Sequence, residues 1–323
     1  RVRCIYKEQK QGRRIMLVNG IWQENWQPVQ NKDEDGRFVR QTSSFRHQIG
    51  DPDFPAEAGR YHLYVAYICP WASRTLMART LKGLGNVISV TVVNPKLTDQ
   101  GWQFGGFEDA EPDPFDDTTY MHEIYSRADP EFTGRATVPV LWDKKNRTIV
   151  NNESADILRM LNHAFDDFTS DADALDLYPE HLQNDIDALN SETYESLNNG
   201  VYKAGFATTQ LAYEEAYQHV FSTLDQLEKQ LSDGRTYLLG EDFTESDIRV
   251  FVTLIRFDLA YHGLFKCNRN TLKEMHNLHA YMKRVLDLPG VRNTVFPDHI
   301  KAGYYSVKAL NPTGIVPVGP LNL

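Results

Sequence analysis

Short apolar runs alternate with helical spacings of apolar residues in the first half of the chain. The run 61–67 is rich in residues that favour strands, and the β-branched run 87–93 predicts a second, buried strand. Between them, apolar residues over 76–84 share one helical face, and Gly83 and Gly85 provide an end for that helix. The order strand, helix, strand predicts a βαβ unit with a right-handed crossover.

The same region continues with a predicted hairpin and a further helix. Residues 138–142 and 148–150 favour strands and flank the polar turn 144–147. Residues 94–134 are rich in Gly, Pro, Asp and aromatics, and their length predicts a functional insertion rather than an ordinary connection. The first domain therefore spans about 61–165 in the order β-α-β, insertion, β-β-α.

Beyond an Asp-rich linker the hydrophobic pattern becomes helical. Apolar residues step by three and four positions over 213–231, which is the spacing of an amphipathic helix. Residues 244–247 have the pattern of a capping box before an apolar stripe over 248–259, and another helix is predicted at about 271–286. We therefore expect an all-helical second domain over 175–297.

At the two ends of the chain, hydrophobic residues show no sustained helical or strand periodicity. Residues 1–60 mix polar residues with isolated aromatics such as Trp22 and Trp26, which predicts an N-terminal extension that packs through its rings. Residues 298–323 contain Tyr304 and then Pro and Gly, so we expect a tail that wraps the surface. With the two domains, the pattern predicts an α/β plus all-α fold.

Charge and composition narrow the possible partners. The chain has 323 residues, a size that suggests two domains, and a formal net charge of -10. An acidic protein is a poor match for nucleic acid or for an anionic membrane surface, because both need an excess of Lys and Arg. No apolar run is long enough to cross a membrane. We therefore expect neither nucleic acid nor a membrane among its partners.

The cysteines suggest neither a disulfide framework nor a metal site. Cys4, Cys69 and Cys267 are an odd, widely spaced set without a CxxC pair. No roles for Cys4 and Cys267 follow from the sequence. A reducing compartment fits best, so we expect a cytoplasmic protein, with an organelle still open because the sequence begins at Arg1.

Cys69 is the strongest candidate for chemistry. The run Cys69-Pro70-Trp71-Ala72 lies between a predicted strand and a predicted helix, where free backbone N–H groups and the helix dipole favour an anion. This position predicts a thiol with a lowered pKa and a nucleophilic thiolate. Because Ala72 occupies the second position of a dithiol motif, an external thiol must resolve any mixed disulfide. The alternative is a buried structural cysteine.

Two further segments predict a cradle beside this thiol. Pro139 within a strand can be a cis proline that leaves the Val138 backbone able to pair with an extended ligand. Glu153 and Ser154 open a helix whose N–H groups can hold a carboxylate, although they can also be a simple helix cap. Together these features predict a site for a short anionic thiol peptide such as glutathione.

The same residues resemble the glutathione transferase superfamily, and specifically its Xi class, the glutathionyl-hydroquinone reductases. The resemblance covers nearly the whole chain and includes the Cys-Pro-Trp-Ala motif, the insertion at Gly101-Trp102 and the segment Asn151-Asn152-Glu153-Ser154. It implies a thioredoxin-like N-terminal domain, a helical C-terminal domain and glutathione as co-substrate. It also implies a homodimer.

The family pattern assigns roles residue by residue. It implies that Cys69 is the nucleophile and that two groups of residues bind the substrate. The glutathione-binding group is Trp102, Arg135, Val138, Glu153 and Ser154. The hydroquinone-binding group is Tyr202, Tyr261 and Tyr304. With 16 tyrosines in the chain, any one of them is otherwise more often structural than catalytic.

The expected activity is the reductive removal of glutathione from glutathionyl-hydroquinones through a Cys69 mixed disulfide, which a second glutathione resolves. One alternative is a general thioltransferase or dehydroascorbate reductase of the cysteine-type glutathione transferases. Another is a non-catalytic binding module that keeps the transferase fold as a scaffold. The long insertion and the tyrosines argue against the first alternative, and the intact cradle around Cys69 argues against the second.

Overall fold

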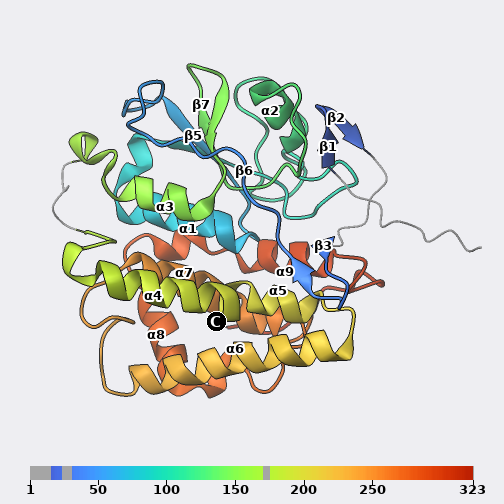
Figure 1. Cartoon of the computed structure of the whole chain (residues 1–323), viewed down its shortest axis with the longest axis vertical. Coiled ribbons are helices and arrows are strands. Elements are labelled where there is room, and N and C mark those ends of the chain that lie inside the picture. The colour runs from blue at the N-terminus through green and yellow to red at the C-terminus, as the bar shows by residue number, and fades with distance from the viewer. Residues whose placement is uncertain (1–15, 24–30, 170–174, 323) are drawn as a thin grey trace, which may run out of the picture.

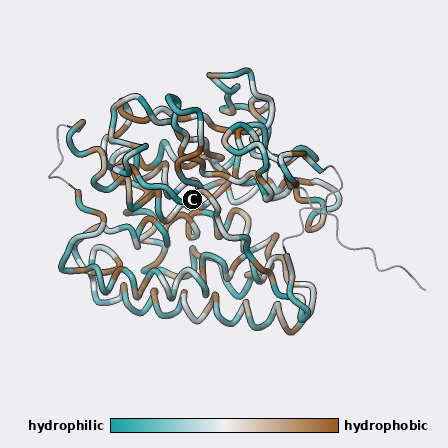
Figure 2. Tube along the Cα trace, turned by 45° about the horizontal axis from the view of Figure 1, so that its top comes forward, coloured by the Kyte–Doolittle hydropathy of each residue, from teal (hydrophilic) through white to brown (hydrophobic). Residues whose placement is uncertain are grey.

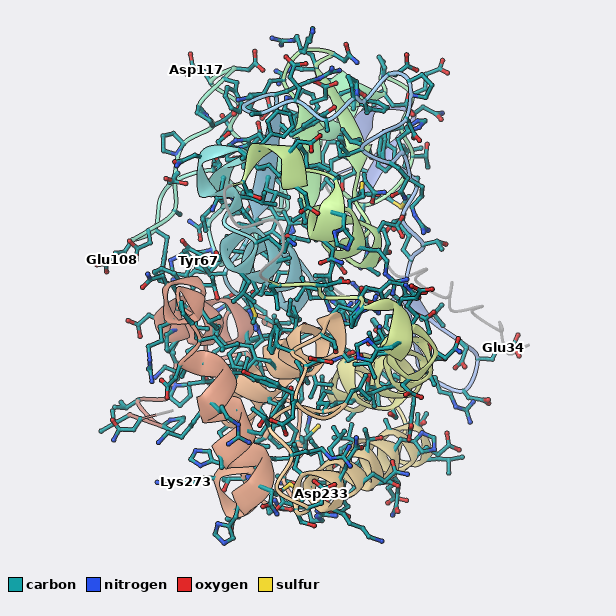
Figure 3. The ribbon with its side chains drawn as sticks, turned by 90° about the vertical axis from the view of Figure 1, so that its left-hand side faces the viewer. Glu34, Tyr67, Glu108, Asp117, Asp233 and Lys273 are labelled. Atoms are coloured by element: carbon teal, nitrogen blue, oxygen red, sulfur yellow. The ribbon has the colours of Figure 1, made fainter. Side chains whose placement is uncertain are left out.

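The computed structural model describes residues 16–23, 31–169 and 175–322. Figure 1 shows two stacked halves, one built around a small sheet and the other built of helices. Figure 3, a side view of the same arrangement, places Asp117 at the outer end of the sheet half, Lys273 and Asp233 at the outer end of the helical half, and Tyr67 near their junction. The predicted fold class is therefore confirmed.

The sheet of the first half has four strands in the order β6-β5-β7-β8. They are β5 (Tyr61–Val65), β6 (Ser89–Val92), β7 (Val140–Asp143) and β8 (Thr148–Asn151). β5 and β6 are parallel and the other pairs are antiparallel. As predicted, β7 and β8 form a hairpin. β5 lies inside the sheet and is buried along its whole length, whereas β6, which we expected to be buried, is an edge strand that begins exposed at Ser89.

Three helices complete this half. They are α1 (Pro70–Leu81), α2 (Met121–Ala128) and α3 (Ser154–His163). Figure 1 shows α1 and α3 on the side of the sheet that faces the helical half, and α2 away from that junction. Helix α2 lies inside the segment 94–134 that we expected to be a functional insertion, so part of that segment is helical.

The helical half contains six α-helices within the described residues. They are α4 (Gln183–Thr193), α5 (Gly200–Gly205), α6 (Gln210–Leu231), α7 (Glu245–Arg256), α8 (His276–Leu286) and α9 (Pro297–Tyr305). The expected capping box begins α7, where the Thr244 N–H donates to the Asp247 carboxylate at 2.8 Å. Single turns of 3-10 or π-helix occupy Leu84–Asn86, Asp166–Phe168, Glu180–Leu182, Tyr194–Asn198, Phe257–Tyr261, Leu272–Glu274 and Val291–Thr294.

The predicted tail from residue 298 begins with helix α9 instead of irregular chain. Pro297 occupies the first turn of this helix, where its missing N–H costs nothing. Ile300 and Tyr304 lie four residues apart, and both are buried in the core. This helix therefore places Tyr304 in the interior, which an unpaired surface tail would not do.

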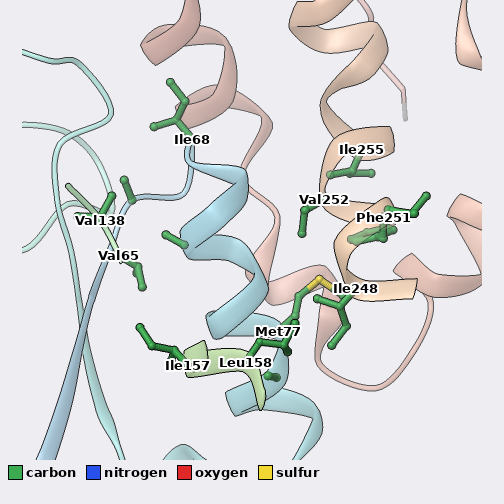
Figure 4. Packing of buried hydrophobic residues seen from close by; sticks show 14 of the residues in the cluster. Val65, Ile68, Met77, Val138, Ile157, Leu158, Ile248, Phe251, Val252 and Ile255 are labelled. Atoms are coloured by element: carbon green, nitrogen blue, oxygen red, sulfur yellow. The ribbon is translucent and has the colours of Figure 1, made fainter. Parts of the chain in front are cut away.

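One continuous hydrophobic core joins the two halves. Hydrophobic segments concentrate in the interior and hydrophilic segments on the outer turns (Figure 2). Figure 4 shows α1 between the sheet half and α7, with Met77 against Ile248, while Val252 and Ile255 also face α1. All four side chains are buried. This packing fixes the start of α1 relative to the helical half.

The N-terminal extension forms two short hairpins that contact both halves. They are β1 (Met16–Val18) with β2 (Ile21–Gln23), and β3 (Asn31–Lys32) with β4 (Phe38–Val39). The Leu17 N–H donates to the Gly134 carbonyl at 2.9 Å, and the Thr208 N–H donates to the Gly36 carbonyl at 3.3 Å. Trp26 lies outside the described residues, whereas Phe38 and Phe54 are buried as rings that anchor the extension.

Candidate active site

Cys69 is the N-cap residue of α1, directly after the turn that follows β5. Its Sγ lies 3.5 Å from the Ala72 N–H, which donates to it, and 3.6 Å from the Val138 carbonyl oxygen. Figure 4 shows Ile68 and Val138 on neighbouring segments near the start of this helix. Pro70 at the first helical position and a half-buried thiol match the expected position of a reactive cysteine.

The pKa of this thiol differs from the prediction. Burial raises the pKa of Cys69, and this effect outweighs the N–H groups of Ala72 and Trp71 and the charges of Arg40 and Arg256, which lower it. The prediction of a lowered pKa is therefore wrong for the protein alone. A helix N-terminus supplies only a partial positive charge, which is not enough once water is removed from the sulfur.

One of the two cations that lower the pKa of Cys69, Arg256, belongs to the helical half. The Arg256 guanidinium at the end of α7 is buried and donates across the junction to the Tyr67 carbonyl at 2.7 Å, the Ile68 carbonyl at 2.8 Å and the Ser73 hydroxyl at 2.6 Å. Its acceptors are neutral, so its charge stays available to Cys69. Arg256 thus fixes the turn that carries the thiol, and no local pattern around Cys69 predicted it.

Two other arginines, Arg74 and Arg79, belong to helix α1 itself but bind elsewhere. The Arg79 guanidinium donates to the carbonyls of Ile88 and Gly85 instead. Arg74 packs against the Trp71 ring and donates to the Asn198 amide oxygen at 3.1 Å. Neither is among the charges that act on Cys69.

A cavity of about 230 Å³ opens beside Cys69 at the junction of the two halves. Five of the predicted site residues line it together with Cys69. They are Trp102, Arg135, Val138, Tyr202 and Tyr304. The walls also include Ile68, Trp71 and Phe206, so much of this surface is apolar. An aromatic group could therefore lie within reach of the sulfur.

A smaller and more polar cavity of about 50 Å³ adjoins the first. It contains the two remaining glutathione-binding candidates, Glu153 and Ser154, at the start of α3. Val138 and Arg135 line both cavities, so the two form one cleft. The Ser43 hydroxyl of the N-terminal extension donates to the Glu153 carboxylate at 2.9 Å, which makes the extension a wall of this polar end.

The cis proline lies between the two cavities. The Val138–Pro139 peptide bond is cis, as predicted. Within the described part of the chain the Val138 N–H donates to no protein acceptor. This leaves the Val138 backbone able to pair with an extended peptide beside the Cys69 sulfur.

The three candidate tyrosines form one hydroxyl cluster. The Tyr304 hydroxyl lies 2.5 Å from that of Tyr202 and 2.8 Å from that of Tyr261. Tyr202 and Tyr304 line the cavity, whereas Tyr261 is fully buried and is not among the lining residues. The structure therefore brings all three together but places Tyr261 behind Tyr304, where direct contact with a substrate is not to be expected.

The cluster has a preferred direction of proton donation. The Tyr261 hydroxyl lies 2.8 Å from that of Tyr304 and also forms a hydrogen bond with Tyr202, so its proton is held within the cluster. Both bonds to Tyr202 lower the pKa of Tyr202, which favours Tyr202 as the acceptor and leaves its own proton for the cavity. Burial raises the pKa of all three phenols, while the hydrogen bonds from Tyr304 and Tyr261 lower that of Tyr202. Tyr202 is thus the most acidic position of the cluster.

The other cysteine that the structure describes takes no part in this site. Cys267 is buried, and burial raises its pKa to about 12, so it is a structural residue. Cys4 lies outside the described residues. Within the described ranges no group of three or more His, Cys, Asp or Glu side chains is placed to share a metal ion, and no helix is long and apolar enough to span a membrane.

The fold and the cleft define the class of protein as a glutathione transferase. The sequence model of the glutathione S-transferase N-terminal domain matches residues 68–164, and that of the C-terminal domain matches residues 210–284. The crystal structure of the glutathione S-transferase Xi from Phanerochaete chrysosporium is similar, with a TM-score of 0.88, 46% identity and coverage of 91% of this chain and 98% of that chain.

Two curated relatives narrow the class. The chain is 47% identical to the glutathionyl-hydroquinone reductase PcpF of Sphingobium chlorophenolicum, over 94% of this chain and 96% of PcpF. It is also 47% identical to the glutathionyl-hydroquinone reductase YqjG of Escherichia coli, over 94% of each chain. The glutathione-bound structure of YqjG has a TM-score of 0.82 at 45% identity, covering 95% of this chain and 96% of that chain. The chain belongs to the Xi class of the glutathione transferases, together with these reductases.

Proposed function

We propose that this protein reduces glutathionyl-hydroquinones to hydroquinones with glutathione as co-substrate. The observation that carries the proposal is the position of a single thiol, Cys69, in one cleft that has a polar, peptide-binding end and an apolar end with tyrosine hydroxyls. A substrate made of a tripeptide joined through sulfur to an aromatic ring matches both ends. The names of the relatives PcpF and YqjG support the same activity.

The polar end provides groups for the glutathione part of the substrate. The Val138 backbone would pair with the cysteinyl residue, which places the substrate sulfur beside Cys69. Ser154 at the start of α3 offers its hydroxyl and backbone N–H to a carboxylate, and Glu153 offers a carboxylate to an ammonium group. Trp102 and Arg135 would hold the remainder of the peptide from the insertion side of the cleft.

In the first step the Cys69 thiolate attacks the sulfur of the substrate. A bond forms between the two sulfurs, and the bond from the substrate sulfur to the aromatic carbon breaks. The electron pair of that bond stays on the aromatic carbon, which takes a proton and leaves as the free hydroquinone. The enzyme retains glutathione as a mixed disulfide on Cys69, so the aromatic product has been reduced by two electrons at the expense of the thiol.

The proton for the aromatic carbon would come from Tyr202. Its hydroxyl lines the apolar cavity near Cys69, and the donation order of the cluster leaves its proton directed into that cavity. The raised pKa keeps the phenol protonated and ready to donate at neutral pH. Tyr304 would then stabilise the resulting phenolate by donating to it, with Tyr261 supporting Tyr304 from behind.

In the second step a glutathione thiolate attacks the mixed disulfide. This releases oxidised glutathione and regenerates the Cys69 thiolate, so the two glutathione sulfurs carry the oxidation. The reaction should follow ping-pong kinetics. Because Ala72 stands where a dithiol motif has its resolving cysteine, the motif of Cys69 offers no intramolecular route, and the other described cysteine, Cys267, is buried.

Paired rate measurements test the proposal. Turnover of a glutathionyl-hydroquinone should greatly exceed turnover of a small mixed disulfide, and Cys69→Ser should abolish both. Comparable or faster reduction of the mixed disulfide would favour the alternative of a general thioltransferase. An unmutated protein that turns over neither substrate would favour a non-catalytic scaffold, and a Cys69→Ser variant that keeps its activity would contradict both enzymatic functions.

We further propose that the protein works as a homodimer in the cytoplasm. The proposal of a dimer follows from the superfamily, whose members are commonly dimers. The proposal of the cytoplasm follows from Cys69, which needs a reducing compartment that contains glutathione. Light scattering of the purified protein would test the first proposal, and localisation of the tagged full-length product would test the second.

A further inference from the structure

Arg40 stands at the mouth shared by the two cavities, and neither the sequence motifs nor the family pattern gave it a role. It follows strand β4 in the N-terminal extension, and it lines both the apolar and the polar cavity. Its guanidinium carbon lies 3.7 Å from the centre of the Trp71 ring. A guanidinium stacked flat on an indole keeps its N–H edge free to face the cleft.

The donors of Arg40 have no protein partner. Among the described residues Arg40 forms no hydrogen bond and no ion pair, although its neighbours in the extension are paired. Arg37 binds Glu215 of α6, and Arg46 binds Asp156 of α3. Arg37 and Arg46 therefore attach the extension to the two halves, while Arg40, held by stacking alone, has five N–H donors available for a ligand.

The polar cavity gives those donors a defined target. Residues 40–44 form one wall of this cavity, and Glu153 and Ser154 at the start of α3 lie across it. The γ-glutamyl end of glutathione carries one ammonium and one carboxylate, so it needs both an acidic and a basic contact. Glu153 supplies the acidic contact, but Ser154 is neutral. A cation on the opposite wall completes the pair.

We propose that Arg40 binds the α-carboxylate of the γ-glutamyl residue of glutathione. The inference rests on the proposed binding of glutathione in this cleft, but not on any turnover of it. Arg40 would act from the extension while Ser154 acts from α3, so the ligand would join the extension to the thioredoxin-like domain. The charge of Arg40 also acts on Cys69, which fits its position between the peptide end and the sulfur.

Calorimetric binding to the reduced protein tests this with two ligands. One is glutathione, and the other is 4-aminobutyryl-cysteinyl-glycine, which lacks only the α-carboxylate. Arg40→Met should weaken glutathione binding about tenfold, the loss typical of an exposed charge-assisted contact, and should leave binding of the analogue nearly unchanged. Arg40→Lys should fall between, because it keeps the charge but loses the planar stack. Arg292→Met, which removes an exposed arginine paired with Asp287 far along the chain, controls for net charge.

The outcomes below would overturn the assignment of Arg40 to the α-carboxylate or would separate it from the proposed function. Equal weakening of both ligands by Arg40→Met would mean that Arg40 binds another part of the peptide or only shapes the cleft. Unchanged glutathione binding in Arg40→Met, or an equal loss in Arg292→Met, would also overturn it. If glutathione does not bind the unmutated protein, this inference and the proposed function fail together. Suppose that Arg40→Met weakens the binding of glutathione but not of the analogue, while the unmutated protein does not turn over glutathionyl-hydroquinones. Then only the proposed function fails.

Discussion

Replacing Tyr202 by Phe removes one oxygen atom from the cavity wall and keeps the ring. The ring packs against Phe206 and Phe265, so the apolar shape of the cavity should persist. The loss leaves the Tyr304 hydroxyl without its acceptor at 2.5 Å, which should cost about 1 kcal/mol of stability. The folded protein therefore remains available for kinetic measurement.

The effect on catalysis should be much larger than the effect on stability. If Tyr202 protonates the aromatic carbon, its removal takes away general acid catalysis, which contributes about 10²- to 10⁴-fold in enzymes. We therefore expect kcat/KM for a glutathionyl-hydroquinone to fall at least about a hundredfold, or about 3 kcal/mol in the barrier. Tyr261→Phe should have a smaller effect, because Tyr261 does not line the cavity and can act only through the other phenols of the cluster.

A mixed disulfide of glutathione and a small thiol separates proton donation from every other role of Tyr202. Its leaving group is a thiolate, which needs no protonation to depart. Tyr202→Phe should therefore keep the rate of mixed-disulfide reduction within about threefold of the unmutated enzyme, since thiol exchange depends on Cys69 and the glutathione site. In both reactions the Cys69 sulfur is the nucleophile, and both substrates carry the same glutathione peptide.

Two results would exclude Tyr202 as the proton donor. Equal loss on both substrates would show that Tyr202 supports Cys69 or glutathione binding rather than protonating carbon. Full activity on the glutathionyl-hydroquinone would show that the proton comes from another group. In that case Tyr304→Phe should be measured next, because Tyr304 is the other phenol of the cluster that lines the cavity.

Three further outcomes follow from the structure. Because burial holds the pKa of Cys69 above its usual range, its rate of alkylation by iodoacetamide should keep rising with pH beyond neutrality as the thiolate forms, and a plateau at or below neutral pH would contradict this. Arg256→Met should shift that alkylation profile to still higher pH, whereas Ser73→Ala, which removes only one hydrogen bond of Arg256, should not. Equal profiles for Arg256→Met and the unmutated protein would exclude a role for the charge of Arg256. Asp143→Ala should lower the free energy of unfolding in urea by about 3 kcal/mol, because it leaves the buried Arg60 guanidinium without its bidentate partner, and a change under about 1 kcal/mol would show that Glu57 replaces it.

Much of the fold followed from local patterns. Strand β5, the hairpin β7–β8 and the capping box at Thr244 were predicted because each depends on residues adjacent in sequence. Helix α2 was missed since it lies in a Gly- and Pro-rich segment, although its apolar residues show a clear face once Met121, Ile124 and Tyr125 are aligned. The helix at the C-terminus was missed for a related reason, because the Pro and Gly residues later in 298–323 suggested irregular chain, whereas Pro297 occupies the first turn of a helix.

Site residues could be predicted where they lie in one sequence motif. They could not be predicted where the fold brings together segments that are distant in sequence. Cys69 and the cis proline could be recognised from their own neighbourhoods. Arg40 and Arg256 could not, since they lie far from Cys69 in sequence and reach it only through the packing of the extension and of α7. The direction of the thiol pKa was wrong for the same reason, because burial is a property of the whole cleft.

The proposed reaction requires that Cys69 take glutathione from an aromatic carbon. Mass spectrometry of the reduced enzyme, after addition of a glutathionyl-hydroquinone without free glutathione, detects this transfer. We predict one glutathione attached to Cys69 for each hydroquinone released, and removal of this adduct when glutathione is added. Release of hydroquinone with no adduct on Cys69 would exclude Cys69 as the group that accepts glutathione.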